Sequence, residues 1–512
     1  MASQSHAELA PVELSAFMHL GIADAHISGS AHTVVSGITL DSRAVISGDM
    51  FAAITGHNRH GLQFVDEAVQ RGAVAILTDA AGWSMLNAEP PVELSIPVLV
   101  IPDARTWMGE VSHLIYGRAA GKLRLLGVTG TNGKTTTATM IEAALVTAGR
   151  SAGFIGTTGV HIGTEVLNSS RTTPEATTLH ELFAQMHDLG VSDVVMEVSS
   201  HAMSEHRIGG MHFEVVGFTN LSQDHLDYHG TMEEYFKAKS SLFRRDRASR
   251  GVVCIDSSWG ERLVAEADIP IATVTASGKQ ADWSIELTSL TKARISGPMG
   301  EQAEVQLQLP GEFNRANAVL AYAMLRLIEI PSEAIVSAFS TVQVAGRLEK
   351  IQGSNGAAGI EGFVDYAHTP DAVQRVLTAV RELTDGQVIA VIGAGGDRDV
   401  TKRPLMGQIA ANLADQLIVT DDNPRSEDPS LIRAEILAGI DATAKAQIGS
   451  ILEVGDRSLA ITTAVKLARP GDVVVVLGKG HELGQEIGDV ITPFDDRAVL
   501  RSALEAINAG VQ

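Results

Sequence analysis

The chain has 512 residues, of which 45% are hydrophobic, and a formal net charge of −22. This charge disfavours general binding to nucleic-acid phosphates, so we expect no nucleic-acid partner. The length suggests roughly three domains of about 150 residues each. The single cysteine, Cys254, excludes an intrachain disulfide and a multi-cysteine metal site, and its strand-like context GVVCID predicts a buried thiol.

The N-terminal segment MASQSHAELAPVELSAFMHLG has no cationic start followed by an apolar core, so it does not resemble a signal peptide. No apolar run approaches the length of about 18 residues that a membrane-spanning helix needs. We therefore expect a soluble, cytoplasmic protein with no membrane partner.

Short apolar runs alternate with helical segments along three stretches, 1–118, 119–343 and 344–512. The first contains DMFAAITG, AVAILTD and IPVLVI; the second contains LRLLGV, SDVVMEV and FEVVGFTN before a β-rich part, SIELTSL to EVQLQL. The third contains GFVDYA, QVIAVIGAGG, DQLIVTDD and DVVVVLGKG. Apolar strands between helices are typical of parallel sheets covered on both faces. The sequence predicts an α/β protein of three domains, with ligands at the carboxyl ends of the strands.

A glycine-rich loop follows the strand LRLLGV. It consists of Gly130, Thr131, Asn132, Gly133, Lys134, Thr135 and Thr136. Freed backbone N–H groups can surround phosphates, Lys134 can reach the outer phosphates, and the Thr135 hydroxyl can ligate Mg²⁺. The standard spacing would place a glycine at Val128, but a mere strand-to-helix turn does not explain the Lys-Thr pair. We predict ATP binding.

A second glycine-rich segment, GAGGDRD at 393–399, follows the strand QVIAVI. A dinucleotide-binding fingerprint needs a third glycine where Arg398 stands. A bulky cation there would block close helix packing, so we exclude a nicotinamide site.

Polar residues follow the next two central strands. Glu197 lies near the end of VVMEV, and His225 lies in SQDHLDYH after FEVVGFTN. If both strands neighbour the phosphate loop, these side chains could ligate Mg²⁺ beside ATP and support acyl phosphorylation. Alternatively, His225 caps a helix and Glu197 pairs with a core arginine. The helical segment TMEEYFKAKSSLF carries Lys237 and Lys239, which are expected to be solvated.

A series of segments covering nearly the whole chain resembles the Mur ligase family. In chain order they are GTNGKTTT, TTPEA, MEVSSHAMSEHR, NLSQDHLDYHGTMEEYFKAK, LPGEFNRANAVLA, GRLEK, DYAHTPDA, GAGGDRD, TDDNPRSEDP and GKGHE. The resemblance implies an N-terminal UDP-sugar-binding domain, a central P-loop ATPase-type domain with a parallel sheet, and a C-terminal Rossmann-like domain for the incoming amino acid. It also implies an ATP-dependent acid–amino-acid ligase of peptidoglycan precursor synthesis, the member that adds a diamino acid as third residue.

The resemblance assigns side chains to each ligand. The UDP-sugar and its peptide would contact Leu40, Ser42, His57, Asn58, Arg59, Thr172, Thr173, Ser199, Glu205 and Arg207. Glu205 stands where the family pattern has a glutamine. Magnesium would be held by Thr135, Glu197, His225 and a carbamylated Lys239. The nucleotide site would be closed, when the C-terminal domain swings in, by Asn314, Arg347, Asp365 and His368. The catalytic set would be Lys134, Lys239, Arg347, Asp365 and His368.

The choice of amino acid rests on DNPR, which follows the strand QLIVT and comprises Asp422, Asn423, Pro424 and Arg425. A guanidinium fork can bind a carboxylate bidentately, and meso-diaminopimelate has a distal carboxylate that lysine lacks. Arg398 could support this contact. Glu482 could take the distal ammonium, with the carbonyl of Gly478. The alternative is that Arg425 forms a salt bridge with Glu427 or Asp428.

The reaction implied is carboxylate activation: ATP phosphorylates the D-glutamyl γ-carboxylate of UDP-MurNAc-L-Ala-D-Glu, and the amine of diaminopimelate displaces phosphate. We expect Mg²⁺ as cofactor, small-molecule substrates and a monomer. One rival is the same reaction with lysine or another diamino acid. A second, a folylpolyglutamate synthetase, is disfavoured by the N-terminal segment 40–61, and a nucleotide-dependent switch or scaffold is disfavoured by DNPR and GKGHE.

Overall fold

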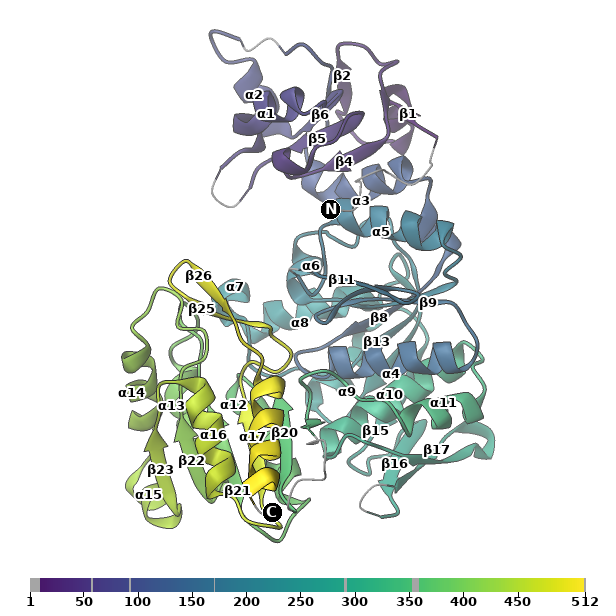
Figure 1. Cartoon of the computed structure of the whole chain (residues 1–512). Helices are drawn as coiled ribbons and strands as arrows, with labels where there is room; N and C mark the ends of the chain where they lie inside the picture. Colours follow the sequence, from purple (N-terminus) through teal and green to yellow (C-terminus); the bar gives the residue numbers. More distant parts are fainter. Residues whose placement is uncertain are drawn as a thin grey trace.

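The computed structural model describes residues 10–56, 59–91, 94–169, 171–289, 292–351 and 359–510. Three large sheets follow one another along the chain, each flanked by helices (Figure 1). The N-terminal part stands at one end of the central part, and the C-terminal part lies at its side. The α/β fold predicted from the sequence is confirmed. None of the described helices has the length and apolar character needed to cross a membrane.

The N-terminal sheet has five strands and contains the three apolar runs of this region. Its order is β2 (His26–Ser28), β7 (Val98–Val100), β6 (Ala75–Thr78), β5 (Asp49–Ala53) and β4 (Gly37–Thr39). All neighbours are parallel except β2 and β7. The helices of this part are α1 (Val65–Gln70), α2 (Ala80–Leu86) and α3 (Ala104–Ile115).

The central sheet has eleven strands, parallel in the middle and antiparallel at both edges. Its order is β11 (Glu165–Leu167), β10 (Gly159–Ile162), β9 (Ala152–Gly156), β12 (Asp193–Glu197), β8 (Arg124–Thr129), β13 (Phe213–Phe218), β14 (Ala248–Cys254), β15 (Ile271–Thr275), β16 (Trp283–Leu287), β17 (Lys292–Ser296) and β18 (Gln302–Gln306). Cys254 is buried at the end of β14, as predicted.

Both faces of the central sheet are covered, because alternate side chains of each strand enter different cores. On β12, Val194 and Met196 belong to a core shared with the N-terminal part, whereas Val195 belongs to the opposite core. The helices of the opposite core are α4 (Lys134–Thr147), α10 (Glu312–Leu327) and α11 (Ser332–Phe339). On the side of the shared core lies α5 (Ala176–Asp188).

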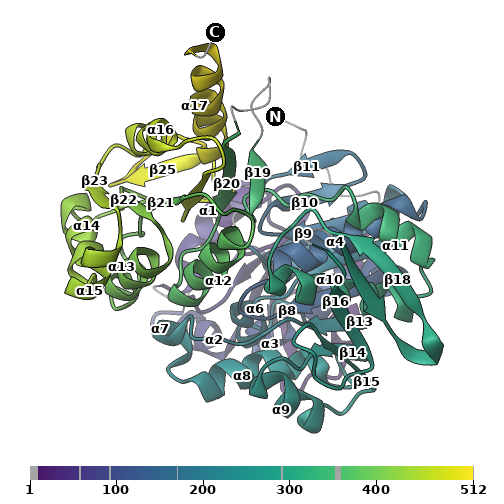
Figure 2. The ribbon, with the colours of Figure 1, turned by 90° about the horizontal axis from the view of Figure 1, so that it is seen from below.

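The C-terminal sheet has six strands, of which all but the edge strand β19 are parallel. Its order is β19 (Glu349–Ile351), β20 (Glu361–Asp365), β24 (Val473–Leu477), β21 (Val388–Ile392), β22 (Gln416–Val419) and β23 (Ser450–Glu453). One face packs on α12 (Pro370–Arg381), α13 (Lys402–Leu413) and α14 (Pro429–Ala438); the other packs on α16 (Arg457–Leu467) and α17 (Asp496–Gly510) (Figure 2). A hairpin, β25 (Gly484–Ile487) and β26 (Val490–Pro493), extends from this part.

Candidate active site

The glycine-rich loop joins β8 to α4 at the carboxyl end of the central sheet. Gly130 and Gly133 have φ of +146° and +88°, which favours glycine at both places. A Cβ on Gly133 would lie 2.3 Å from Oδ1 of Asn317. Nζ of Lys134 donates to the carbonyls of Gly130 and Thr131 at 2.9 Å each. The loop therefore holds its lysine ready beside a backbone cradle suited to phosphate.

Glu197 ends β12, the strand next to β8, and its side chain is fully buried. Its Oε2 accepts from the hydroxyl of Thr135 at 3.1 Å, and its Oε1 accepts from the backbone N–H of Thr157 at 2.8 Å. These partners are threonines, so the pairing with a core arginine is not found among the described residues. A hydroxyl and a carboxylate side by side are oxygen ligands of the kind Mg²⁺ prefers.

His225 stands at the N-cap position of the short helix α7 (Leu226–His229), but its side chain makes no capping hydrogen bond. Nε2 lies 3.4 Å from Oδ2 of Asp224, and both side chains line the same cavity as the phosphate loop. Burial lowers the pKa of His225 and favours the neutral imidazole, the form that ligates metals. Within the described ranges, no three His, Cys, Asp or Glu residues form a metal site by themselves. Magnesium would therefore also need phosphate or water oxygens.

Lys239 lies on α8 (Met232–Ser240) beneath the phosphate loop and is only 1% exposed. Its Nζ donates to the Gly130 carbonyl at 2.8 Å and lies 4.6 Å from the centre of the Tyr235 ring. Burial, followed by the charge of Lys134, lowers the pKa of Lys239 well below its usual value. Lys237 on the same helix is solvated and pairs with a neighbouring glutamate. The expectation of a solvated lysine is thus correct for Lys237 and wrong for Lys239.

The C-terminal part supplies the opposite wall of the site. Nη2 of Arg347 lies 3.4 Å from the hydroxyl of Thr135, and its guanidinium lies 4.6 Å from the centre of the Tyr366 ring. Nε of Arg347 is buried without a hydrogen-bond partner in the described part of the chain. Nδ1 of His368 is 2.8 Å from the Tyr366 carbonyl. Arg347 thus has donors to spare for an anionic ligand at the phosphate loop.

Asn314 is buried in the first turn of α10 and contacts the site through a second asparagine. Its Nδ2 donates to the Pro310 carbonyl at 2.8 Å, and its Oδ1 accepts from Nδ2 of Asn317 at 3.3 Å. Asn317, one turn further on, reaches Gly133 and lines the cavity. The sequence did not single out Asn317, although its spacing of three from Asn314 places both on one helix face.

Residues of the central and C-terminal parts line one cavity of about 220 Å³. It brings together predicted residues from both: Thr131, Asn132, Gly133, Lys134, Thr135, Thr136, Thr172, Glu197, His225, Arg347, Asp365 and His368. Side chains that the sequence did not indicate also line it, among them Thr157, Phe313, Asn317, Tyr366 and Arg375. Asn132 spans the gap, since its Nδ2 lies 3.4 Å from Oδ2 of Asp371 on α12.

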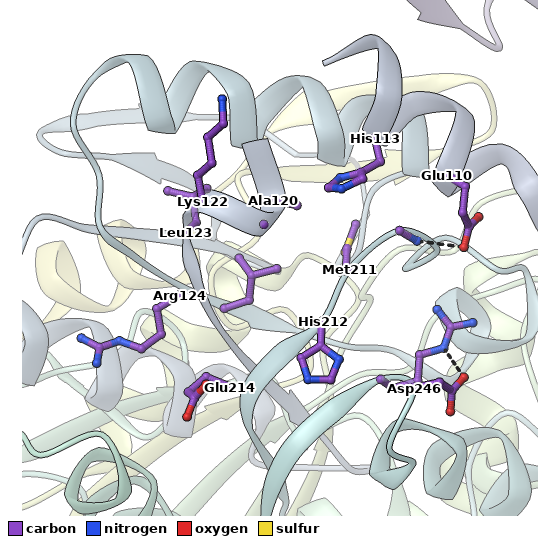
Figure 3. Close-up of a pocket in the computed structure, with 14 residues that line it drawn as sticks. Glu110, His113, Ala120, Lys122, Leu123, Arg124, Met211, His212, Glu214 and Asp246 are labelled. Carbon is purple, nitrogen blue, oxygen red and sulfur yellow. Dashed lines mark hydrogen bonds and ion pairs between the residues drawn. The ribbon is translucent and has the colours of Figure 1, made fainter. Parts of the chain in front are cut away.

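A larger cavity, of about 740 Å³, lies at the opposite, amino-terminal ends of β8 and β13 (Figure 3). Its charged side chains balance: Lys122, Arg124 and Arg247 against Glu110, Glu214 and Asp246. It contains none of the predicted site residues. The smaller cavity at the carboxyl ends is therefore the candidate active site.

The predicted peptide-binding residues form a hydrogen-bonded network next to Glu197. The hydroxyl of Thr173 donates to the Glu197 carbonyl at 2.8 Å and accepts from the N–H of Ser199 at 3.0 Å. Nη1 of Arg207 donates to the Thr173 carbonyl at 2.9 Å, while Nε and Nη2 donate to Oε2 of Glu205 at 3.0 and 2.5 Å. Two carboxylates therefore neutralise Arg207, because Oε1 of Glu175 also lies 3.3 Å from its Nε.

The UDP-sugar residues predicted in the N-terminal part are spread over two loops. Leu40 and Ser42 follow β4, and the Ser42 hydroxyl donates to Oε2 of Glu67 at 2.6 Å. Arg59 is exposed in the loop after β5. His57 and Asn58 lie outside the described residues.

The predicted amino-acid-binding residues meet at the carboxyl ends of β24, β21 and β22, which are neighbours in the sheet. Nδ2 of Asn423 donates to Oε2 of Glu482 at 2.8 Å. Nζ of Lys479 donates to Oδ1 of Asn423 at 2.8 Å and to Oε2 of Glu482 at 3.0 Å. Gly478 packs tightly, because a Cβ there would lie 2.3 Å from Oδ2 of Asp422. Arg398 is exposed in the loop after β21.

Arg425 has a different ion-pair partner from those considered for it. Its Nε donates to Oε2 of Glu486 at 2.9 Å, and its Nη1 donates to the Gly396 carbonyl at 2.7 Å. Glu427 instead binds Arg403, at 2.8 Å. A pairing of Arg425 with Glu427 or Asp428 was therefore the wrong alternative. The partner lies 61 residues away, on the hairpin β25–β26.

Three family models match the chain in order: Mur ligase family, catalytic domain, over 34–116; Mur ligase middle domain, over 128–325; and Mur ligase, glutamate ligase domain, over 346–480. A UDP-N-acetylmuramoyl-L-alanyl-D-glutamate--2,6-diaminopimelate ligase of Corynebacterium glutamicum is 46% identical over 489 residues, 93% of each chain. The chain belongs to the Mur ligase family. It is thus an ATP-dependent acid–amino-acid ligase.

Solved structures agree with this assignment. A UDP-N-acetylmuramoyl-L-alanyl-D-glutamate--2,6-diaminopimelate ligase matches with a TM-score of 0.68 and 31% identity, over 98% of this Mur ligase and 100% of that chain. A folylpolyglutamate synthase of Mycobacterium tuberculosis matches with a TM-score of 0.60 and 19% identity, over 72% of this chain and 91% of that one. The second likeness shows a shared fold alone.

A Glu205→Gln variant of this Mur ligase is expected to have a KM for the UDP-linked dipeptide that is lower by about threefold to tenfold. Glutamine can still accept a hydrogen bond from Arg207, but the variant loses one of the carboxylates beside the guanidinium, keeps Glu175, and no longer repels the carboxylates of the peptide at position 205. Steady-state kinetics with saturating ATP and amino acid measure the change. An unchanged or higher KM would show that Glu205 does not compete with the substrate.

Turnover is expected to fall as the pH drops below about 6, because Asp365 then takes up a proton. Its carboxylate accepts from the N–H groups of Leu348 at 2.6 Å and Ala367 at 2.7 Å, which fixes the loop carrying Arg347. Burial raises the pKa of Asp365 from 3.8 to about 6, although Arg347 opposes the shift. The stability that Asp365 contributes to the folded state is therefore fully present below about pH 4 and is lost as the pH rises through about 6. The ionised carboxylate, which is the active form, appears over the same pH range.

The pH dependence of kcat, followed with Asp365→Asn in parallel, checks this assignment. The variant should show at pH 8 the low turnover that the unmodified enzyme shows at pH 5. If the variant keeps full activity at pH 8, the acid limb belongs to another group.

Proposed function

We propose that this Mur ligase adds meso-diaminopimelate to the D-glutamyl γ-carboxylate of UDP-MurNAc-L-Ala-D-Glu in peptidoglycan precursor synthesis. The observation that carries the choice of amino acid is the place of Arg425, two residues after Asn423, which itself contacts Glu482 at the carboxyl ends of neighbouring strands. A guanidinium there provides a counter-charge for the distal carboxylate of diaminopimelate, which lysine lacks. The relatives named for this reaction support the same substrate.

The first step transfers the γ-phosphoryl group of ATP to the glutamyl γ-carboxylate, giving an acylphosphate and ADP. The cations of Lys134, which belongs to the loop, and of Arg347, whose Nη2 lies 3.4 Å from the Thr135 hydroxyl, would stabilise the charge on the transferring oxygens. Thr135, Glu197, His225 and a carbamate on Lys239 fit Mg²⁺, which would supply further charge neutralisation. We propose that Thr173, Ser199 and Arg207 orient the peptide, because their network adjoins Glu197.

In the second step the free amine of the amino acid attacks the acyl carbon. The new C–N bond forms as the C–O bond to phosphate breaks; inorganic phosphate leaves with the electron pair and takes up the proton that the nitrogen loses. The amine must come from the C-terminal part and the acylphosphate from the central part. Closure of the two, which Asn132 and Asp371 already bridge, therefore brings the reactants together.

The proposal extends to the layout of the chain. We assign residues 1–118 to the UDP-sugar, with Leu40, Ser42, His57, Asn58 and Arg59 as its contacts, 119–343 to ATP and 344–512 to the amino acid. One chain carries all three sites, which supports a monomer, and we propose that it works in the cytoplasm. Light scattering in solution tests the monomer.

Phosphate release with UDP-MurNAc-L-Ala-D-Glu and ATP, measured with meso-diaminopimelate and with L-lysine, tests the function. We expect a kcat/KM for diaminopimelate at least about a hundredfold higher, because lysine leaves Arg425 without a carboxylate. A preference for lysine would refute the substrate but not the ligase. Phosphate release that needs no amino acid would instead support a nucleotide-dependent switch.

A further inference from the structure

The cavity of about 740 Å³ lies where the N-terminal part meets the central part, at the end of the central sheet opposite the phosphate loop (Figure 3). Helix α3 and the segment Ala119–Lys122 form one wall. The amino ends of the neighbouring strands β8, β13 and β14 form the other. Ligand pockets of proteins have volumes of about 300–1,000 Å³. This cavity is therefore large enough for a small organic molecule.

A close backbone contact holds the two walls together. A Cβ on Gly109 of α3 would lie 2.2 Å from the carbonyl carbon of Gly209, and Gly210 has a φ of +69°. The N–H of Gly210 donates to Oε1 of Glu110 at 3.2 Å. Because these glycines let α3 approach the segment before β13 so closely, the shape of the cavity is built into the fold.

Three buried polar atoms on these walls have no hydrogen-bond partner among the described residues: Oε2 of Glu110, Nδ1 of His113 and Nη2 of Arg124. Burial, followed by the charge of Arg118, lowers the pKa of His113. Its imidazole is therefore neutral, and Nδ1 can donate or accept according to the tautomer. A buried polar group without a partner destabilises the fold, so such groups mark places where water or a ligand binds.

Two opposite charges of the cavity are also left without a counter-charge. Four of its six charged side chains have ion-pair partners: Arg124 with Asp193, Glu214 with Arg250, and Arg247 with Asp246. The other two, Lys122 and Glu110, form no ion pair with any residue that the structure describes. Figure 3 shows these two on opposite sides of the cavity. A ligand can therefore meet a carboxylate on one side and cations on the other.

We propose that this cavity is a second ligand site, which binds an amphoteric molecule with its ammonium on Glu110 and its carboxylate on Lys122 and Nη2 of Arg124. Each charged group of such a molecule meets an opposite charge. An anion without the ammonium leaves the buried oxygen of Glu110 unpaired, and a cation without the carboxylate leaves Lys122 and Arg124 unmatched. The simplest molecules of this class are ω-amino acids, whose methylene chain would pack against Leu125 and Met211.

The second site is separate from the site of the ligase reaction. The two cavities share no lining residue. Strand β8, which has six residues, begins at the second site and ends at the phosphate loop, so about 20 Å separate them. Both sites can therefore be occupied together. A ligand at the second site contacts the N-terminal part and the central part at once.

The test measures binding of 4-aminobutanoate, 6-aminohexanoate and 8-aminooctanoate to the whole chain by saturation-transfer NMR titration. At least one of the three is expected to bind with a Kd below about 10 mM. The alkanoate and the alkylamine of the same chain length each keep only one charge. We expect both to bind at least about tenfold more weakly than the best ω-amino acid.

Two variants assign this binding to the cavity. Glu110→Gln keeps an oxygen for the N–H of Gly210 and loses the charge, and Lys122→Met keeps most of the side-chain length. Each is expected to raise the Kd at least about tenfold. Glu165→Gln on β11 and Lys292→Met on β17 replace exposed residues outside the cavity and should leave the Kd unchanged. An unchanged kcat of the Glu110 and Lys122 variants shows that their fold is intact.

A further variant excludes the amino-acid site as the place of binding. Arg425→Ala removes a cation of that site and should leave the Kd of the ω-amino acid unchanged. Loss of binding in this variant would overturn the inference. The inference also fails if none of the three ω-amino acids binds, or if the analogues with one charge bind equally well. Unchanged Kd values in both Glu110→Gln and Lys122→Met would refute it as well.

Discussion

Replacing Lys239 by methionine is expected to lower kcat about a thousandfold while the enzyme still binds ATP. The amine is buried and lies 2.8 Å from the carbonyl of Gly130, and burial followed by the charge of Lys134 lowers its pKa well below the usual value, which favours the neutral form. A neutral amine can attack CO₂; a C–N bond forms and a proton is released, so the neutral amine becomes an anionic carbamate beside the magnesium site. Methionine has a similar length but cannot make this carbamate.

Carbon dioxide provides the second arm of the experiment. Activity of the unmodified enzyme should fall in CO₂-depleted buffer and recover when bicarbonate is added, and ¹³C-labelled bicarbonate should give a carbamate signal in the NMR spectrum. Lys237→Met, two residues away on the same helix but solvated, is the matched control and should respond like the unmodified enzyme. If Lys239→Met retains normal turnover, the lysine has only a structural role.

Lys239 also shows what local sequence could not reveal. The segment TMEEYFKAKSSLF correctly predicted a helix, and its two lysines look alike in sequence. Their difference arises because α8 packs under the phosphate loop, whose Gly130 is 109 residues away from Lys239. The family resemblance selected Lys239, but its burial follows from tertiary packing alone.

The strands and the phosphate loop could be predicted from the sequence because they depend on residues that are close together in the chain. Apolar runs such as DVVVVLG form strands because burial on both faces needs only a continuous apolar pattern. The loop at Gly130–Lys134 is formed by adjacent residues, and positive φ explains its glycines. Where two strands approach the same edge of a sheet, as β8 and β12 do, Glu197 reaches the loop as expected.

Long-range partners account for most of what was missed. Asn317, Tyr366 and Arg375 enter the cavity because helices and loops from two parts of the chain meet there. The hairpin β25–β26 lacks a strong apolar alternation, and its exposed residues gave no signal of burial. Its Glu486 is nevertheless the ion-pair partner of Arg425.

Replacing Arg425 by alanine is expected to raise the KM for diaminopimelate about a hundredfold and to leave the KM for ATP nearly unchanged. The guanidinium lies at the carboxyl end of β22, whereas ATP is expected at the phosphate loop of the central sheet. The loss of the guanidinium should therefore change the KM for diaminopimelate and not the KM for ATP. Arg425→Lys keeps the charge but loses the fork, and it should give an intermediate rise of about tenfold. Initial rates with each substrate varied in turn provide the measurement.

Arg294→Ala serves as the control, because it removes an exposed arginine paired with Glu304 at the edge of the central sheet and should change neither constant. Equal effects of Arg425→Ala on both KM values would mean that the arginine supports the fold of the C-terminal part rather than the amino acid. The variant also leaves Glu486 without its arginine partner. The KM for lysine, whose distal end carries only an ammonium, should therefore rise less than the KM for diaminopimelate. The ratio of the KM values for diaminopimelate and lysine in Arg425→Ala therefore shows whether the arginine acts on the distal carboxylate or on the site in general.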